Sequence, residues 1–294
     1  MIIGMVGLGR MGGAMARRLT QQGFDVVGWD RDARATAALA ADGLRVAVDA
    51  RGVAAAAEIV ISSITEDHGV RQIFTAPNGF LAGEVTGKLF IEMSTLQPLT
   101  GRELSPLVEA RGARLIEAPV LGTIPQVRAG TLFAMVGGKA EDLERARPVL
   151  EKLTRRIVHM GGSGTGYAMK LAANLGLGAY IQALAESLAL GLQQGLTVEQ
   201  MLDALSESAT ACGWLKSKID VLKGGSAEMT LDIRTLRKDM MSAVATGALC
   251  GVPMPLAAGT LTSLSAAVDG NYGAGDIAEL PKFYREAMVQ KFER

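Results

Sequence analysis

The chain has 294 residues, 49% of them hydrophobic, which is enough for one large domain or two ordinary ones with a substantial core. Lys+Arg and Asp+Glu both number 30, and this balance argues against a nucleic-acid or membrane-surface partner. The two cysteines, Cys212 and Cys250, and two histidines without metal-like spacing argue against a disulfide framework and a zinc site.

The first half of the chain alternates short apolar runs with segments of helical periodicity, several of which end at a glycine. The apolar runs, which we predict to be strands, are 1–9, 24–30, 58–64, 88–95 and 113–122. The periodic segments, which we predict to be helices, are 11–23, 33–43, 68–74, 101–112 and 140–153. Strands that alternate with helices in this way predict parallel βαβ units, with helices on both faces of the sheet.

The character of the sequence changes at a glycine-rich stretch near residue 163. Beyond it the chain is rich in alanine and leucine, and no convincing strand appears. The segments with clear helical periodicity are 168–195, 197–209 and 229–251. The sequence therefore predicts an α/β Rossmann domain over 1–163, followed by an all-α domain over 164–294 that begins with a long helix.

Two apolar stretches raise the question of a membrane. The N-terminal stretch is interrupted by glycines and Arg10 too early for a signal peptide. The region 171–192 is long enough for a membrane span, but Asn174, Gln182 and Glu186 interrupt it. A helix buried between layers of protein explains this region better, so we expect a soluble, cytoplasmic protein.

A GxGxxG turn joins the first strand to the first helix and consists of Gly7, Leu8, Gly9, Arg10, Met11 and Gly12. In such a turn the first glycine permits the tight bend, the second lets a pyrophosphate approach the backbone, and the third allows close helix–strand packing. The helix N-terminus behind it offers free N–H groups and a positive dipole end. Asp30 ends the second strand, 18 residues after Gly12, where an acidic residue binds ribose hydroxyls. The sequence therefore predicts an adenine dinucleotide site.

The choice between NAD and NADP depends on the residues after the second strand. The carboxylate of Asp30 would repel a 2′-phosphate, which favours NAD. Arg31 follows directly and Arg34 lies nearby, so a cation that could hold the phosphate is present. We expect NAD, with NADP as the alternative.

Two further pairs of residues stand at the carboxyl ends of the third and fourth predicted strands. They are Ile64-Thr65 and Ser94-Thr95. Ligands of open parallel sheets bind beyond the carboxyl ends of the strands, so we expect these residues to line the paths of the pyrophosphate and nicotinamide. Ser94 or Thr95 could equally cap the next helix.

The stretch GYAMKLAANLGL, residues 166–177, places Lys170 in an apolar segment with Asn174 four residues later. At helical spacing the two side chains share one face. Taken alone, this pattern is also explained by a lysine that runs its stem along the helix and puts its amine in water.

Five stretches then occur together in order, namely GLGRMGGAMARRL, EMST, EAPVLG with AGTLFAMVGG, GGSGTGYAMKLAANL and LRKDM. Over nearly the whole chain they resemble the β-hydroxyacid dehydrogenases, the family of the 3-hydroxyisobutyrate dehydrogenases and the tartronate, glyoxylate and succinic semialdehyde reductases. The resemblance implies that Lys170 is the general acid/base, with its pKa lowered by partial burial, and that Asn174 binds substrate or orients the lysine. It also implies that Lys238 closes over the cofactor, helped by Asp239. Trp214 and Leu231 stand at substrate-pocket positions of the family, although packing explains them equally well.

One stretch departs from the family pattern. Relatives typically carry Ala-Pro-Val-Ser-Gly-Gly, whose serine and glycines anchor the substrate carboxylate, but this chain has Leu121, Gly122 and Thr123 at the last three positions. The Gly122 N–H and the Thr123 hydroxyl remain as expected carboxylate donors. Loss of the serine hydroxyl points to a bulkier or less polar acid, or to a substrate without the usual carboxylate, and it leaves the reaction type unaffected.

The leading hypothesis is an NAD-dependent dehydrogenase of a short β-hydroxy acid. One alternative is an NADPH-preferring reductase of the glyoxylate/succinic semialdehyde type, and another is a catalytically silent, cofactor-binding scaffold, against which the presence of Lys170 argues.

The apolar helical segments predict a homodimer or homotetramer formed through the helical domain, as the family also implies.

Overall fold

The computed structural model describes residues 1–226 and 228–292. The chain forms two compact units, Met1–Ala172 and Ala173–Arg294. The division falls inside the long helix α8 (Thr165–Gln193), whereas the sequence prediction places it before that helix, at 163/164. The first turns of α8 belong to the first unit because Tyr167 is buried in its core.

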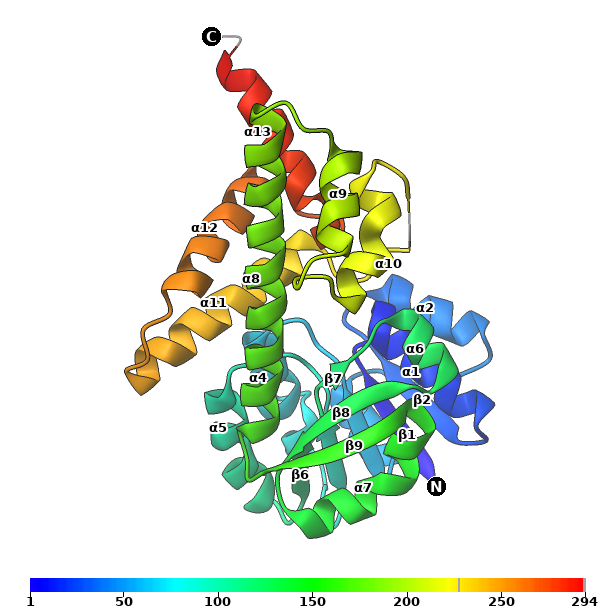
Figure 1. Ribbon diagram of the computed structural model, residues 1–294. Coiled ribbons are helices and arrows are strands. Elements are labelled where there is room, and N and C mark those ends of the chain that lie inside the picture. Colours follow the sequence, from blue (N-terminus) through cyan, green and yellow to red (C-terminus); the bar gives the residue numbers. More distant parts are fainter. Residues whose placement is uncertain (227, 293–294) are drawn as a thin grey trace. The chain divides into compact units, whose positions relative to one another are not determined.

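The first unit is a sheet with helices on both faces (Figure 1). Its strands are β1 (Ile2–Val6), β2 (Asp25–Trp29), β3 (Arg45–Val46), β4 (Ile59–Ser62), β5 (Leu89–Glu92), β6 (Arg114–Glu117), β7 (Val120–Leu121), β8 (Leu132–Gly137) and β9 (Thr154–Gly161). Its helices are α1 (Arg10–Gln21), α2 (Ala33–Ala41), α3 (Ala50–Ala56), α4 (Asp67–Thr75), the 3-10 turn η1 (Phe80–Ala82), α5 (Pro98–Glu109), α6 (Ile124–Ala129) and α7 (Ala140–Leu153). The predicted Rossmann-type α/β domain is therefore confirmed.

The strand order is β3-β2-β1-β4-β5-β6-β8-β7, with β9 paired to β8. The strands β1 to β6 are parallel, as predicted, so β1 and β4 are neighbours from which the order runs in opposite directions. Such a switch point opens a crevice at the carboxyl ends of the strands, where ligands of this architecture bind.

The prediction of parallel strands is wrong at one edge of the sheet. The predicted strand 113–122 is two strands, β6 and β7, and β8 runs antiparallel to both. The interruption falls at Ala118-Pro119, and proline has no N–H to donate to a ladder. The chain can therefore leave the parallel sheet there and return through the short helix α6, which the sequence analysis missed.

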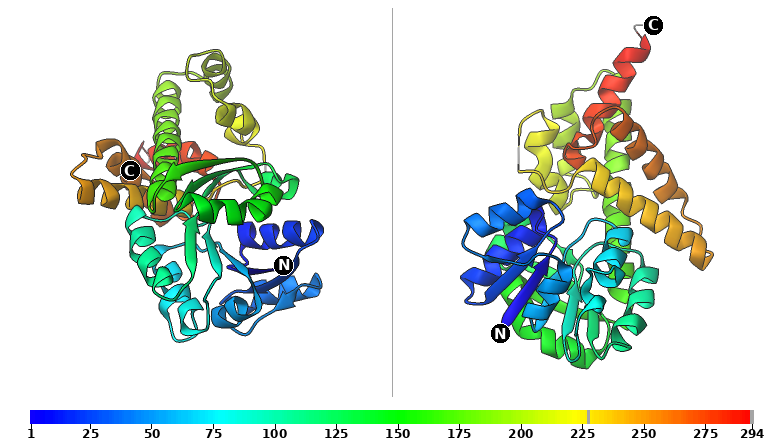
Figure 2. Two further views of the ribbon diagram at one scale, coloured as in Figure 1. Left: turned by 90° about the horizontal axis from the view of Figure 1, so that it is seen from below. Right: turned by 180° about the vertical axis from the view of Figure 1, so that it is seen from behind.

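The two faces of the sheet have separate cores. One is built around α1, α6 and α7, and the other around α3, α4, α5 and the start of α8 (Figure 2). Because β5 and β6 carry apolar side chains on both faces, the side chains of their last residues, Glu92 and Glu117, are also enclosed.

The second unit is helical, as predicted. Besides most of α8, it contains α9 (Val198–Ser206), α10 (Gly213–Leu222), α11 (Ile233–Cys250), α12 (Pro255–Asp269), the 3-10 turn η2 (Ile277–Glu279) and α13 (Leu280–Phe292). In the described part of the chain α8 alone is long and apolar enough to cross a membrane, a test that the core helix of a soluble protein also passes. Ile181, Leu184 and Leu188 of α8 are buried in the cores of this unit.

Candidate active site

The glycine-rich turn has the geometry that a bound pyrophosphate requires. Gly7 has φ +87°, and a Cβ there would lie 2.2 Å from the carbonyl oxygen of Ser63. A Cβ at Gly12 would lie 1.9 Å from the carbonyl oxygen of Gly7, so α1 approaches the strand closely only because residue 12 is glycine. Gly9 faces open space, since no atom lies within 4 Å of an added Cβ. A dinucleotide phosphate therefore fits beside Gly9, at the N-terminus of α1.

The other members of the turn play different parts. Leu8 is buried and Met11 packs against the same core, so only their backbones are available to a cofactor. Arg10 is exposed at the first position of α1. The backbone N–H of Leu8 donates to Oδ2 of Asp30 at 2.6 Å. This bond ties the end of β2 to the glycine turn, so Asp30 both shapes the turn and faces the ligand crevice.

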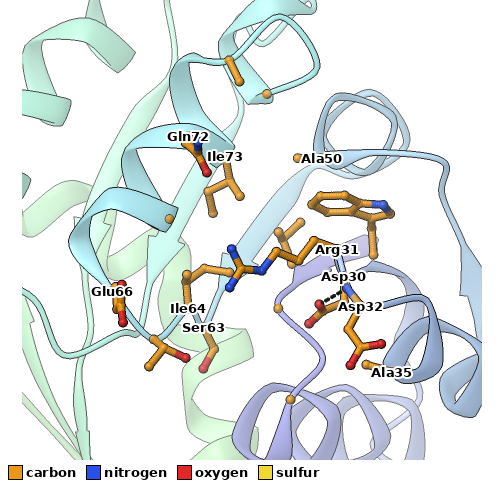
Figure 3. A pocket seen from close by; sticks show the side chains of 18 of the residues that line it. Asp30, Arg31, Asp32, Ala35, Ala50, Ser63, Ile64, Glu66, Gln72 and Ile73 are labelled. Atoms are coloured by element: carbon orange, nitrogen blue, oxygen red, sulfur yellow. Dashed lines mark hydrogen bonds between the residues drawn. The ribbon is translucent and has the colours of Figure 1, made fainter. Parts of the chain in front are cut away.

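A cavity of about 680 Å³ opens at the carboxyl ends of β1, β2 and β4 (Figure 3). It is lined by six predicted cofactor residues, which are Gly7, Gly9, Asp30, Arg31, Ile64 and Thr65. The side chain of Arg31 extends into the cavity between Asp30 and Ile64, as Figure 3 shows. The structure thus brings together residues from three separate loops around a space of the size that cofactor sites have.

The arginines after β2 are not equivalent. The Arg34 guanidinium is paired with Asp32 through contacts of 3.1 Å to Oδ1 and 2.9 Å to Oδ2. The carboxylate of Asp32 also lines the cavity, and its backbone N–H donates to Oδ1 of Asp30 at 2.8 Å. Two carboxylates therefore lie together in this part of the cavity, where they would oppose a 2′-phosphate, and one of them already pairs with the guanidinium of Arg34.

The residues after β5 are placed differently from the prediction. Ser94 is 4% exposed and does not line the cavity. Its hydroxyl accepts the backbone N–H of Ile64 at 2.7 Å and donates to the carboxylate of Glu92. Ser94 therefore supports the cavity wall from behind, and Thr95, which is half-buried, does not line the cavity either.

Two buried carboxyls at the strand ends were missed by the sequence analysis. Glu92 and Glu117 are the last residues of β5 and β6 and face each other in the strand register. They are 0% and 1% exposed. Burial raises the pKa of both groups, that of Glu92 from 4.5 to about 7, although hydrogen bonds from Ser94, Tyr167 and Ser62 favour its ionised form. The sequence pattern does not single out either glutamate, since only the fold shows that both are enclosed.

Stability should fall with rising pH because of Glu92. Its pKa is raised on folding, so its favourable contribution is complete below 4.5 and is lost as pH rises through about 7. In Glu92→Gln this loss is removed. We expect the difference in unfolding free energy between the variant and wild type to move in favour of the variant by about 3 kcal/mol between pH 4 and pH 8. Urea unfolding at both pH values measures this difference, and a difference that does not change with pH would contradict the expectation.

The predicted catalytic pair lies on α8. Lys170 is half-buried and Asn174, one turn further on, is 5% exposed. The side-chain amide of Asn174 donates to Oδ2 of Asp239 at 2.6 Å, and Nζ of Lys238 lies 2.7 Å from Oδ1 of the same carboxylate. The buried Asp239 on α11 therefore fixes the orientations of Asn174 and Lys238 together.

The stretch that departs from the family pattern starts α6. Leu121 is 36% exposed at the end of β7, and Gly122 has φ +125°, which only glycine adopts readily. The Thr123 hydroxyl donates to Oε1 of Gln126 at 2.7 Å and its N–H donates to the same oxygen at 2.9 Å. Thr123 thus belongs to the N-terminal cap of α6, and the Gly122 N–H is the simpler candidate for a carboxylate contact.

Trp214 and Leu231, the other predicted pocket positions, pack in the core of the helical unit. The Trp214 ring meets the Tyr180 ring edge-on at 5.9 Å, and Leu231 is partly buried against the same core. Packing therefore accounts for both.

Two family descriptions match consecutive parts of the chain. Residues 2–162 match the NAD binding domain of 6-phosphogluconate dehydrogenase, and residues 164–284 match the NAD-binding domain of NADP-dependent 3-hydroxyisobutyrate dehydrogenase. Together they account for nearly all of the chain.

Individual relatives agree with these matches. The chain is 34% identical to 3-hydroxyisobutyrate dehydrogenase from Pseudomonas aeruginosa, over 96% of this chain and 98% of that one. It is 35% identical to an NAD-dependent L-serine dehydrogenase from the same organism, over 70% of each chain. Among solved structures, 3-hydroxyisobutyrate dehydrogenase from Mycobacterium tuberculosis, determined with L-serine, matches with a TM-score of 0.85 at 29% identity, over 97% of this chain and 99% of that one.

Proposed function

The chain belongs to the β-hydroxyacid dehydrogenase family, and we propose that it oxidises the hydroxyl group of a short β-hydroxy acid with NAD, using Lys170 as the general base. The observation that carries the proposal is the arrangement on α8, where Lys170 precedes Asn174 by one turn and Asp239 orients the asparagine amide. A scaffold that only bound cofactor would need neither the lysine nor the oriented asparagine. In the reverse direction the same ammonium would act as the general acid.

Each group has a defined part in this reaction. When bound, the dinucleotide supplies the carbon that accepts the hydride. Gly7, Gly9 and the N-terminus of α1 would hold its pyrophosphate, and Asp30 would hold the adenine ribose. Lys170 would take the proton from the substrate hydroxyl, while Asn174 would orient that hydroxyl. Lys238, held by Asp239, would contact the cofactor.

The substrate class follows from the relatives and from Leu121. The names of two relatives refer to 3-hydroxyisobutyrate and L-serine, acids that carry a hydroxymethyl group next to the carbon that bears the carboxylate. Leu121 presents an apolar side chain where the family has a serine. We therefore favour an acid with an apolar substituent over one with a charged amine, with its carboxylate bound by the Gly122 N–H.

Cofactor preference tests the cavity directly. We expect wild type to oxidise the preferred hydroxy acid with a higher kcat/KM for NAD than for NADP, because the Asp30 and Asp32 carboxylates oppose a 2′-phosphate. The double variant Asp30→Asn with Asp32→Ser removes both charges and releases Arg34. It should shift the NAD/NADP ratio of kcat/KM toward NADP by at least about tenfold.

The screen uses a panel of short hydroxy acids with NAD and NADP, together with the matching aldehyde reductions. Glu66→Gln is the matched control, since Glu66 lines the same cavity, and it should leave the ratio unchanged. Turnover of glyoxylate or succinic semialdehyde with NADPH as the preferred reaction would replace the proposal with the reductase alternative. Cofactor binding without turnover of any panel member would favour the scaffold.

We also propose that the protein is a soluble, cytoplasmic homodimer or homotetramer. Its helical unit exposes large apolar side chains on α8, α11 and α12, among them Leu190, Leu249 and Leu256, which are 68%, 67% and 59% exposed. Large exposed apolar side chains mark an interaction site when they form one patch, and we assign these to the contact between subunits. Light scattering at micromolar concentration tests the proposal, and a monomer would contradict it.

A further inference from the structure

The start of α8 rests on the two buried carboxyls of the first unit. Oε1 of Glu117 accepts the backbone N–H of Gly164 at 2.5 Å and the hydroxyl of Ser163 at 2.9 Å. Oε2 of Glu92 accepts the hydroxyl of Tyr167 at 2.7 Å. A carboxylate at a helix N-terminus satisfies N–H groups that the helix leaves unpaired and complements its dipole. The first turn of α8 is therefore held at two points, by two adjacent strands.

The space around these contacts is closed by glycines. A Cβ at Gly101 would lie 2.1 Å from Oε1 of Glu117, and one at Gly137 would lie 2.6 Å from its Oε2. A Cβ at Gly166 would lie 2.7 Å from the carbonyl oxygen of Met135 on β8. The helix start and Glu117 are thus seated directly on neighbouring backbone, and neither can move without displacing main chain.

The same contacts reach the cofactor cavity. Glu92 also accepts the hydroxyl and the N–H of Ser94, and the Ser94 hydroxyl accepts the N–H of Ile64, which lines the cavity. One carboxyl therefore holds the loop after β4 and the first turn of α8 together. Lys170 follows Tyr167 by three residues, or about one helical turn, so a shift of Tyr167 is transmitted to the lysine.

We propose that Glu92, Glu117 and Tyr167 form a carboxyl clamp that fixes the first turn of α8 relative to the cofactor cavity and so positions Lys170 for proton transfer. This inference rests on the proposed function of Lys170. Within the clamp, Tyr167 and Glu92 are positioning residues, since they act on the reaction through Lys170.

A tyrosine hydroxyl is a sensitive point at which to test the clamp. Tyr167→Phe removes one oxygen and leaves the buried ring in place. We expect kcat for the preferred hydroxy acid to fall about tenfold, because a misplacement well below 1 Å already slows proton transfer. The KM for NAD should stay unchanged, because Tyr167 does not line the cofactor cavity. Thr154→Val is the matched control, since it deletes another buried hydroxyl of the same unit, at the opposite end of β9 from α8, and should leave kcat unchanged.

Variants of Glu92 separate position from charge. The carbonyl oxygen of Glu92→Gln can still accept from Tyr167 and from the Ser94 N–H, so this neutral variant should retain a kcat within about threefold of wild type. Glu92→Leu removes the acceptor for Tyr167 and also for Ser94, so it should lower kcat at least as much as Tyr167→Phe. Combining Glu92→Leu with Tyr167→Phe should lower kcat no further than Glu92→Leu alone, as expected of two residues that act through one contact.

A readout without turnover keeps the clamp separable from the proposed function. The rate of reductive methylation of Lys170, followed by mass spectrometry, should change by at least about threefold in Tyr167→Phe and not at all in Thr154→Val. If wild type turns over no panel member but this rate responds, the proposed function fails and the clamp stands. A Tyr167→Phe protein with wild-type kcat and wild-type labelling overturns the clamp.

A second variant covers the case in which Tyr167→Phe does not fold. Ser163→Ala removes a hydroxyl from the Glu117 side of the clamp at a half-buried position. It should lower kcat by about threefold, less than Tyr167→Phe does, because Glu117 still accepts the N–H of Gly164. An unchanged kcat in a folded Ser163→Ala protein counts against the clamp.

Discussion

Replacing Lys170 with alanine should lower kcat for hydroxy-acid oxidation by about 10²- to 10⁴-fold, the usual contribution of a positioned acid/base group. The lysine does not line the cofactor cavity, so the dissociation constant of NAD should change less than twofold. The measurement is steady-state kinetics on the preferred hydroxy acid, with NAD binding followed separately by fluorescence. Activity within tenfold of wild type would remove Lys170 from the mechanism.

Two further variants identify what the lysine contributes. Lys170→Arg keeps a positive charge but cannot give up its proton at working pH, so it should be as slow as the alanine variant if proton transfer is the role. Partial activity in the arginine variant would point to electrostatic stabilisation of the substrate oxygen instead. Lys152→Ala, at an exposed position of α7, is the control and should behave as wild type.

The cofactor end of the fold was predictable because its signals are local. The glycine turn, the helix that follows it and Asp30 lie within the first 30 residues. At Gly7 and Gly12 the structure leaves no room for a side chain, as the motif predicts. The family was also predictable, because five ordered stretches span the chain. Even so, the sequence could not exclude Arg34 as a ligand of the 2′-phosphate of NADP, because it does not show that the guanidinium pairs with Asp32.

The rest of the site depends on contacts between residues far apart in the chain. Ser94 looked like a cofactor ligand, because its place after a strand is that of a ligand residue, yet its hydroxyl is buried on Glu92. The hydrogen bond from the Tyr167 hydroxyl to Glu92 joins positions 75 residues apart, and neither local sequence contains a pattern that predicts it. The antiparallel β7 and β8 were missed for a related reason, since a two-residue strand carries too little periodicity to show its direction.

The helical unit contains a buried ion pair that the sequence equally could not show. Lys218 on α10 is 2% exposed, and its Nζ lies 2.7 Å from Oδ2 of Asp276, which is 6% exposed. Asp276 also accepts the N–H and hydroxyl of Thr230 and the N–H of Ala278. Burial raises the pKa of Asp276, but the hydrogen bonds from Lys218, Ala278 and Thr230 outweigh it, so the pKa is lowered overall. The pair thus joins α10 to η2 and to the segment that leads into α11.

Lys218→Met keeps the side-chain volume and removes the cation, and it should destabilise the helical unit by about 3–5 kcal/mol, because the Asp276 charge is left buried without it. The measurement is urea unfolding followed by Trp214 fluorescence in a Trp29→Phe background, since these are the two tryptophans and Trp214 packs in this unit. Arg147→Met breaks an exposed ion pair of 2.6 Å with Glu144 and should change stability far less than Lys218→Met, because solvent screens exposed pairs. An effect of Lys218→Met as small as that of Arg147→Met would show that solvent screens the Lys218–Asp276 pair.

Two further measurements test whether the buried charge of Asp276 causes the destabilisation in Lys218→Met. A lowered pKa means that Asp276 stabilises the fold above its unfolded value of 3.8 and that this contribution is lost as pH falls. The cost of Lys218→Met should therefore be largest near neutral pH and shrink in acid. Adding Asp276→Asn removes the unpaired charge, so the double variant should be less destabilised than the sum of the two single variants. Because the pair lies in the scaffold that leads into α11, folded Lys218→Met protein should keep most of its kcat, whereas folded Lys170→Ala should not.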